Sequence, residues 1–152
     1  MKFSVFLEGK KTIKFYHGSE HNLPVGTILT SHIDHEKNWG INEWYHVLKD
    51  NKPQNMISRT NAVFLVDNLD DVDLAGGSDH YIYEVLPIGT TEKHDINWIS
   101  ELEMLLEDEF ENNQQQIIQA AKNYWNGVAH YNESVWEYLT LKAKIIKLIE
   151  TN

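Results

Sequence analysis

The alternation of apolar and polar residues predicts strands in the first two-thirds of the chain. Short alternating or apolar runs indicate strands over residues 3–7, 12–16, 62–66 and 81–86. Turn residues separate them, among them a Pro-Val-Gly step at 24–26. The polar segment 90–97 is expected to be a loop.

Helical spacing appears later in the chain. Apolar residues at intervals of three and four predict a short helix over 42–49 and longer helices over 98–110 and 112–125. We expect one or two helical turns over 133–139 and a closing strand over 144–149. This order predicts an α+β fold, with a mixed or antiparallel sheet and two helices inserted before the last strand. A length of 152 residues fits a single domain, 1–152.

Composition narrows the possible partners. The net charge is -10, with 23 acidic against 13 basic residues, and this disfavours general binding to nucleic-acid backbones. No apolar run reaches the roughly 18 residues that suggest a transmembrane helix, so no membrane is expected. Cysteine is absent, which fits a cytoplasmic location.

The first candidate binding stretch is a predicted strand that ends in His17, Gly18 and Ser19. Such an end presents an imidazole, a hydroxyl and backbone amides to a polar ligand, and Gly18 lets the ligand approach the backbone. A hydrogen-bonded structural histidine is the alternative for His17.

Two carboxylates are candidates for chemistry. Asp95 lies in the polar segment before Trp98, where it could act on a ligand or cap the helix that follows. Glu137 stands among aromatic residues near the end of the chain, and burial would make its carboxylate a useful base or cation stabiliser. The alternative for Glu137 is an exposed position on a helical turn.

The acidic stretch 67–73 lacks the spacing of a calcium loop. The scattered histidines give no zinc pattern, so no metal is expected.

Taken in order, these stretches resemble the ADP-ribosyltransferase superfamily, and most closely its small rifampin ADP-ribosyltransferase type. The matching segments are 15–19 with 23–29, 62–66, and 83–89 with the Asp95-x-Asn97 that follows. The region from Glu137 onwards is similar to the end of many members, where a glutamate stands beside a late strand. Helices 99–125 lie outside the resemblance.

The resemblance implies a split sheet around an NAD cleft. His17, with Ser19, would hold the ribose on the adenosine side of NAD. Phe64 stands where the family usually has a tyrosine, and with Trp98 or Trp125 it would sandwich the nicotinamide. Glu137 or Asp95 would act on the reacting ribose. An Arg-Ser-Glu or Gln-x-Glu motif is absent, which leaves the catalytic acid open between these two.

The implied activity is transfer of ADP-ribose from NAD, as a substrate, to an unidentified acceptor, with release of nicotinamide. The acceptor could be a protein, a small molecule or a nucleic acid. Two alternatives remain: a binding or inhibitor module that keeps this fold without turnover, and an NAD glycohydrolase that uses water as acceptor.

Overall fold

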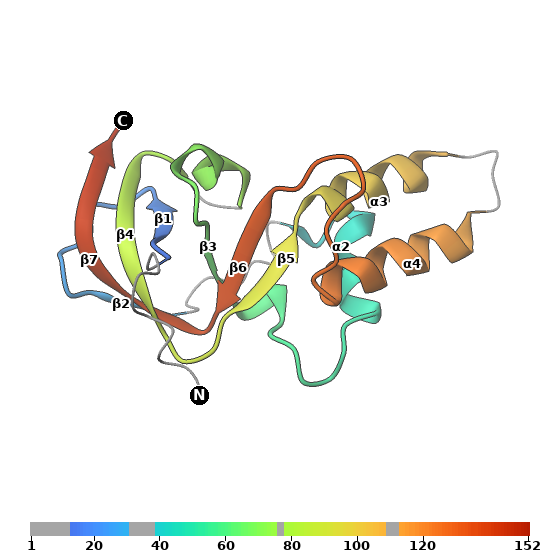
Figure 1. Ribbon diagram of the computed structural model, residues 1–152, viewed down its shortest axis with the longest axis horizontal. Helices are drawn as coiled ribbons and strands as arrows, with labels where there is room; N and C mark the ends of the chain where they lie inside the picture. Colours follow the sequence, from blue (N-terminus) through green and yellow to red (C-terminus); the bar gives the residue numbers. More distant parts are fainter. Residues whose placement is uncertain (1–12, 31–38, 76–77, 109–112) are drawn as a thin grey trace.

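The computed structural model describes residues 13–30, 39–75, 78–108 and 113–152. Two antiparallel sheets make up its strand part (Figure 1). The four-stranded sheet has the order β1 (Phe15–Ser19), β4 (Tyr81–Ile88), β7 (Lys142–Thr151), β2 (Ile28–Thr30). The three-stranded sheet has the order β3 (Val63–Leu65), β6 (Trp136–Thr140), β5 (Glu92–Asp95).

The helices form a separate layer. They are α2 (Glu43–Asp50), α3 (Asn97–Glu107) and α4 (Gln114–Trp125). The described residues also contain the 3-10 turns η2 (Arg59–Asn61) and η3 (Leu69–Leu74), and Val72 of η3 packs with Ile82 of β4. Figure 1 shows the three-stranded sheet between the four-stranded sheet and these helices. The α+β class is confirmed, and each strand pairing among the described residues is antiparallel. Every helix in the described ranges is too short or too polar to cross a membrane.

Two main hydrophobic cores hold these layers. One lies between the sheets and is built from Val63, Leu65, Tyr83, Val85, Tyr138, Ala143 and Ile145. The other lies among the helices and is built from Leu48, Trp98, Leu102, Ile117, Ala120, Ala121, Tyr124 and Trp125. The three-stranded sheet is therefore covered on both faces.

This double burial explains the main errors in the predicted elements. Residues 136–140 form a strand rather than helical turns, and 92–95 form a strand where a loop was expected. β6 is buried over four of its five residues, so it lacks the alternation that marks a half-exposed strand. β5 reads Glu-Lys-His-Asp and has no apolar signal, because backbone pairing to β6 and polar side-chain contacts hold it in place.

The strand boundaries near the chain start also differ from the prediction. β1 runs over 15–19, so His17, Gly18 and Ser19 lie within the strand and not beyond its end. The short strand β2 pairs with β7 and was not predicted. The strand expected over 3–7 lies outside the described residues, as do residues 109–110 of the predicted helix 98–110.

Gly18 is packed against protein backbone. An added Cβ atom would lie 1.9 Å from the Ser78 carbonyl oxygen and 2.6 Å from Val72 Cγ1. The space over Gly18 is thus filled by the segment that follows η3, so the absence of a side chain serves chain packing here. This corrects the expectation that a ligand occupies that space.

We expect Gly18→Ala to destabilise the fold, because the clash is with backbone that cannot move aside. Overpacking of this kind costs about 1–3 kcal/mol, and a backbone contact places the cost at the upper end. Urea unfolding measures it. Gly26→Ala is the comparison: its φ of 95° strains an alanine, but no atom lies within 4 Å of the new Cβ, so about 1–2 kcal/mol is expected. A Gly18→Ala variant with the same free energy of unfolding as the wild type would contradict the conclusion that Gly18 packs against backbone.

Candidate functional site

A buried ion pair joins the three-stranded sheet to the helices. Arg59 is the single arginine of the chain and stands in η2. Its Nη1 donates hydrogen bonds to Glu137 Oε2 and, at 2.6 Å, to the Tyr124 hydroxyl. That hydroxyl in turn donates to Glu137 Oε2 at 2.5 Å. Glu137 is fully buried and Arg59 is 6% exposed, so this network fixes η2, α4 and β6 relative to one another.

Aromatic rings surround the guanidinium. Its Cζ lies 4.8 Å from the ring centre of Phe64, 5.1 Å from Trp39, 5.6 Å from Tyr124 and 5.8 Å from Trp44. Cation–π attraction at these distances favours the charged form. The chain thus holds its single arginine between one carboxylate and an aromatic cage.

The electrostatics of the network keep Arg59 and Tyr124 protonated. Burial disfavours the charge on Arg59, but attraction to Glu137 and Tyr124 outweighs this and raises the arginine pKa. Burial raises the pKa of Tyr124 well above its ordinary value, and Glu137 adds to the effect against the opposing influence of Arg59. Tyr124 therefore remains protonated and able to donate its hydrogen bond.

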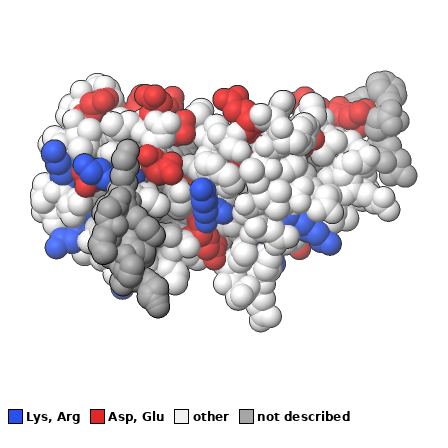
Figure 2. Space-filling view, in the orientation of Figure 1, with Lys and Arg blue, Asp and Glu red and all other residues white. Residues whose placement is uncertain are grey.

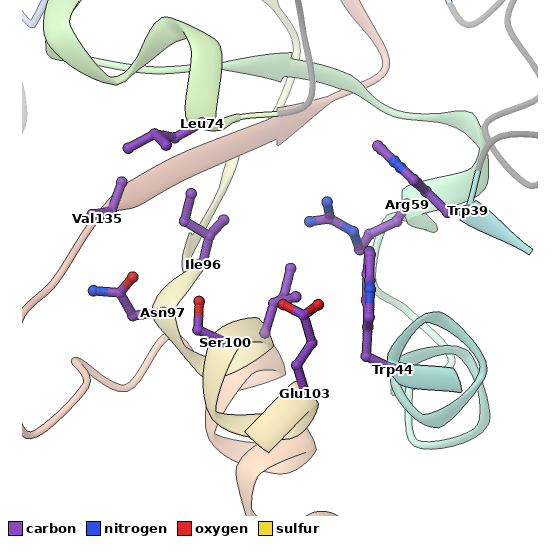
Figure 3. A pocket seen from close by; sticks show the side chains of 10 residues that line it. Trp39, Trp44, Arg59, Leu74, Ile96, Asn97, Ser100, Glu103 and Val135 are labelled. Carbon is purple, nitrogen blue, oxygen red and sulfur yellow. The ribbon is translucent and has the colours of Figure 1, made fainter. Parts of the chain in front are cut away.

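One edge of this network borders a pocket of about 260 Å³. Trp39, Trp44 and Arg59 form one wall (Figure 3). The remaining lining comes from η3, the segment before β6 and the start of α3, and consists of Leu74, Val135, Ile96, Asn97, Ile99, Ser100 and Glu103. Glu137 does not line the pocket; Arg59, which it binds, does.

Two of the predicted binding residues are in direct contact. His17 on β1 donates from Nδ1 to the Phe64 carbonyl oxygen on β3 at 2.8 Å. The amide of Tyr16 also donates to the Val66 carbonyl, at 2.8 Å. His17 therefore ties the two sheets together. The Phe64 ring is 5% exposed and packs against Trp39 and Arg59.

The other predicted ligand contacts have protein partners. The Ser19 hydroxyl accepts from the His21 amide at 3.0 Å. The indole of Trp98 donates to the Val128 carbonyl, and that of Trp125 donates to the Leu48 carbonyl, both at 2.8 Å. Both rings belong to the helical core, and neither lines the pocket.

Asp95 is also fully buried. Its Oδ1 accepts from the amides of Asn97, at 3.0 Å, and Val135, at 3.1 Å, and its Oδ2 accepts from the amide of His130 at 2.8 Å. These three bonds fasten the start of α3 to the segment that leads into β6. Asp95 thus has a structural partner on each oxygen.

The acidic turn η3 carries Asp70, Asp71 and Asp73. Figure 2 shows acidic side chains along the edge of the molecule that carries η3. Burial, followed by the charges of Asp67, Asp70, Asp73 and Glu133, raises the pKa of Asp71. Within the described ranges, no group of three or more histidines and carboxylates is placed to hold a metal ion.

The sequence analysis did not single out Trp39, Trp44, Arg59 and Glu103, which line the pocket, or Tyr124, which binds Arg59. One feature of the sequence pointed to Arg59. The chain has twelve lysines but a single arginine, and that arginine stands three residues before the predicted buried strand 62–66. Arginine is the cation best suited to buried pairing and aromatic stacking. The tryptophans gave no distinct signal, because their spacing also fits core positions.

Comparison with known proteins returns neither a matching family model nor a matching curated protein. The site is therefore interpreted from its own chemistry.

Arg59→Met should be strongly destabilising, because it leaves the Glu137 carboxylate buried without its counter-ion. Breaking a buried pair from one side costs about 3–5 kcal/mol, whereas replacing both partners by apolar groups costs far less. We therefore expect Arg59→Met/Glu137→Met to be more stable than Arg59→Met alone. Urea unfolding of both single variants and the double variant measures the coupling. Simple addition of the two single losses would show that the pair contributes no coupling energy.

Alkaline pH should weaken the fold through Tyr124. The unfolded tyrosine loses its proton near its ordinary pKa of about 10, while the folded one retains it. Above that pH the unfolded state binds fewer protons, so the free energy of unfolding falls as pH rises. In Tyr124→Phe the free energy of unfolding should fall less between about pH 9 and about pH 11 than it does in the wild type. An unchanged fall in Tyr124→Phe would assign the effect to other groups, such as Tyr138, whose pKa is raised to about 12.

Proposed function

We propose that the protein is an NAD-dependent ADP-ribosyltransferase that moves ADP-ribose to an acceptor and releases nicotinamide. The observation that supports this proposal is a continuous chain of contacts that links His17, Phe64 and Glu137, each predicted as a site residue, through Arg59. His17 bonds the Phe64 carbonyl, the Phe64 ring packs on Arg59, and Arg59 binds Glu137. Residues from β1, β3 and β6, far apart in sequence, are thus linked through the three-stranded sheet.

The chemistry suits such an arrangement. The bond between nicotinamide and ribose breaks to leave an oxocarbenium-like sugar, and the acceptor then bonds to the same carbon and gives up its proton. This reaction needs accurate positioning and a nearby negative charge more than extensive proton transfer. His17 would hold the ribose on the adenosine side of NAD. Glu137 would act on the reacting ribose through Oε1, which is buried without a hydrogen-bond partner among the described residues and becomes accessible only when the aromatic cage opens.

A second candidate is a binding module of the same fold without turnover. The observation in its favour is the burial of both carboxylates that could act on the ribose. Asp95 uses both oxygens in backbone hydrogen bonds. Glu137 is held by Arg59 and Tyr124. A ligand reaches Glu137 only if the aromatic cage opens.

Titration of the protein with NAD, followed by assay of nicotinamide release, tests the proposal. We expect His17→Ala to weaken NAD binding about tenfold or more, because a ligand hydrogen bond is lost, while His80→Ala, an exposed histidine, has no effect. Absence of NAD binding at millimolar concentration would exclude both the transferase and the glycohydrolase. Loss of the fold in His17→Ala would show that this histidine serves only to join the sheets.

Glu137→Gln should abolish nicotinamide release and leave NAD binding largely intact, as loss of a transition-state interaction does. Asp95→Asn is the matched comparison, and if it alone abolishes turnover, Asp95 is the acid. Binding without release in the wild type would select the binding module. Release that does not increase when cell lysate is added would select hydrolysis over transfer.

A further inference from the structure

The pocket beside Arg59 is lined mainly by apolar side chains that are still accessible at the surface. Its apolar lining consists of Trp39, Trp44, Leu74, Ile96, Ile99 and Val135. Leu74 is 54% exposed, and the others are half-buried. In Figure 3, Leu74 and Val135 lie across the pocket from the two indoles. Exposed apolar surface of this kind, when polar groups border it, marks sites at which proteins bind one another.

The size of the pocket suits a side chain of a partner protein. Its volume of about 260 Å³ lies below the range of about 300–1,000 Å³ that is usual for drug-sized ligands. Trp39 and Trp44 form part of its wall, with ring centres 6.1 Å apart. Tryptophan is among the residues that contribute most binding energy at the centre of protein–protein interfaces. A large apolar residue of a partner therefore fits between these rings and the aliphatic side.

The acidic turn η3 borders the aliphatic side of the pocket. Leu74 is the last residue of η3, and the same turn carries Asp70, Asp71 and Asp73. Burial raises the pKa of Asp71, and the negative charges of neighbouring carboxylates, among them Asp70, Asp73 and Glu133, raise it further. These carboxylates repel one another, so a positively charged partner would relieve the repulsion.

Two glutamates extend this charge along the pocket. The carbonyl oxygen of Glu133 accepts a hydrogen bond from the side-chain amide of Asn97, which lines the pocket, and Glu103 on α3 lines it directly. With the aspartates of η3, Glu103 and Glu133 form an acidic rim beside the apolar lining. The positive charge of Arg59 in the pocket wall is balanced by its ion pair with Glu137. The excess charge at this face is therefore negative.

We propose that this pocket and its acidic rim bind a basic segment of a partner protein, with an apolar side chain of the segment in the pocket and its lysines or arginines beside the rim. An apolar centre with a charged border is the usual anatomy of such an interface. A nucleic acid or an anionic membrane would bring phosphates against the rim and be repelled. A second copy of the chain carries the same net charge of -10 and is also disfavoured.

Selection of a random peptide display library on the full chain, without NAD, tests this proposal separately from ADP-ribose transfer. We expect the selected peptides to combine lysines or arginines with a large apolar residue. Selection of acidic peptides, of uncharged peptides or of no consistent sequence would overturn the proposal.

Calorimetry of a selected synthetic peptide then separates its two kinds of contact. Binding should weaken as salt is added, because salt screens exposed charges. Replacing the apolar residue of the peptide by serine should weaken binding about tenfold or more. Binding that is insensitive to salt, or that survives the serine replacement unchanged, would contradict the assignment.

Variants of the chain locate the peptide. Leu74→Lys removes apolar surface and adds a cation, so the selected peptide should bind about tenfold more weakly or worse. Asp70→Asn/Asp73→Asn keeps the apolar lining but removes two exposed charges, and it should weaken binding about three- to tenfold and reduce the salt dependence. Asp50→Asn/Glu150→Gln is the matched control, since both residues are exposed, neither lines the pocket and the change in net charge is the same.

The control should bind the peptide as the wild type does, and an equal loss in the control would assign the effect to net charge alone and overturn the site. Unchanged binding in Leu74→Lys would place the peptide elsewhere. All five substituted positions are exposed, so urea unfolding should show each variant to be folded. Sedimentation equilibrium of the chain without peptide covers the remaining occupant: a dimer that Leu74→Lys dissociates would place a second copy on this face and overturn the proposal.

Discussion

The buried pair of Arg59 and Glu137 is the constraint on which the arrangement of the layers depends. Removing both charges from water is costly, and the attraction between them offsets this only with good geometry and additional hydrogen bonds. Tyr124 supplies the additional bond, and the aromatic cage supplies attraction to the cation. The pair therefore holds only when η2, β6 and α4 are all in place, and it makes their relative position specific.

The same pair separates two regions that the sequence suggested were one. On one side, His17 and Phe64 join the sheets by a side-chain hydrogen bond. On the other side lies the pocket, which none of the residues predicted to bind NAD lines. Arg59 touches both regions, since it packs on Phe64 and borders the pocket. A structural change in either region therefore alters the surroundings of the same guanidinium.

The sequence predicted the α+β class, the apolar strands and the longer helices, because those elements show an apolar run or an apolar period. It did not predict β5, whose residues are all polar, or β6, whose burial on both sheet faces hides the alternation. Among the candidate residues, His17 and Phe64 are in contact by a side-chain hydrogen bond between two different sheets, which no predicted strand pairing indicated. Arg59 could not be placed, because its partners Tyr124 and Glu137 are 65 and 78 residues away and only tertiary packing brings them together.

The presence of two separate cores has a consequence for how the molecule opens. The helical core contains Trp98 and Trp125 and has Trp44 packed against it, whereas the strands pack around a core of their own. Proteins open in contiguous cooperative units with different free energies, and these units often coincide with separately packed motifs. Emission from Trp44, Trp98 and Trp125 thus reports the helical layer, whereas Trp136 packs against the core between the sheets, and amide hydrogen exchange in β4 and β7 reports the sheets. Opening of the helical layer would break the hydrogen bonds of Tyr124 to Arg59 and Glu137, uncover the three indoles and leave the strand ladder intact.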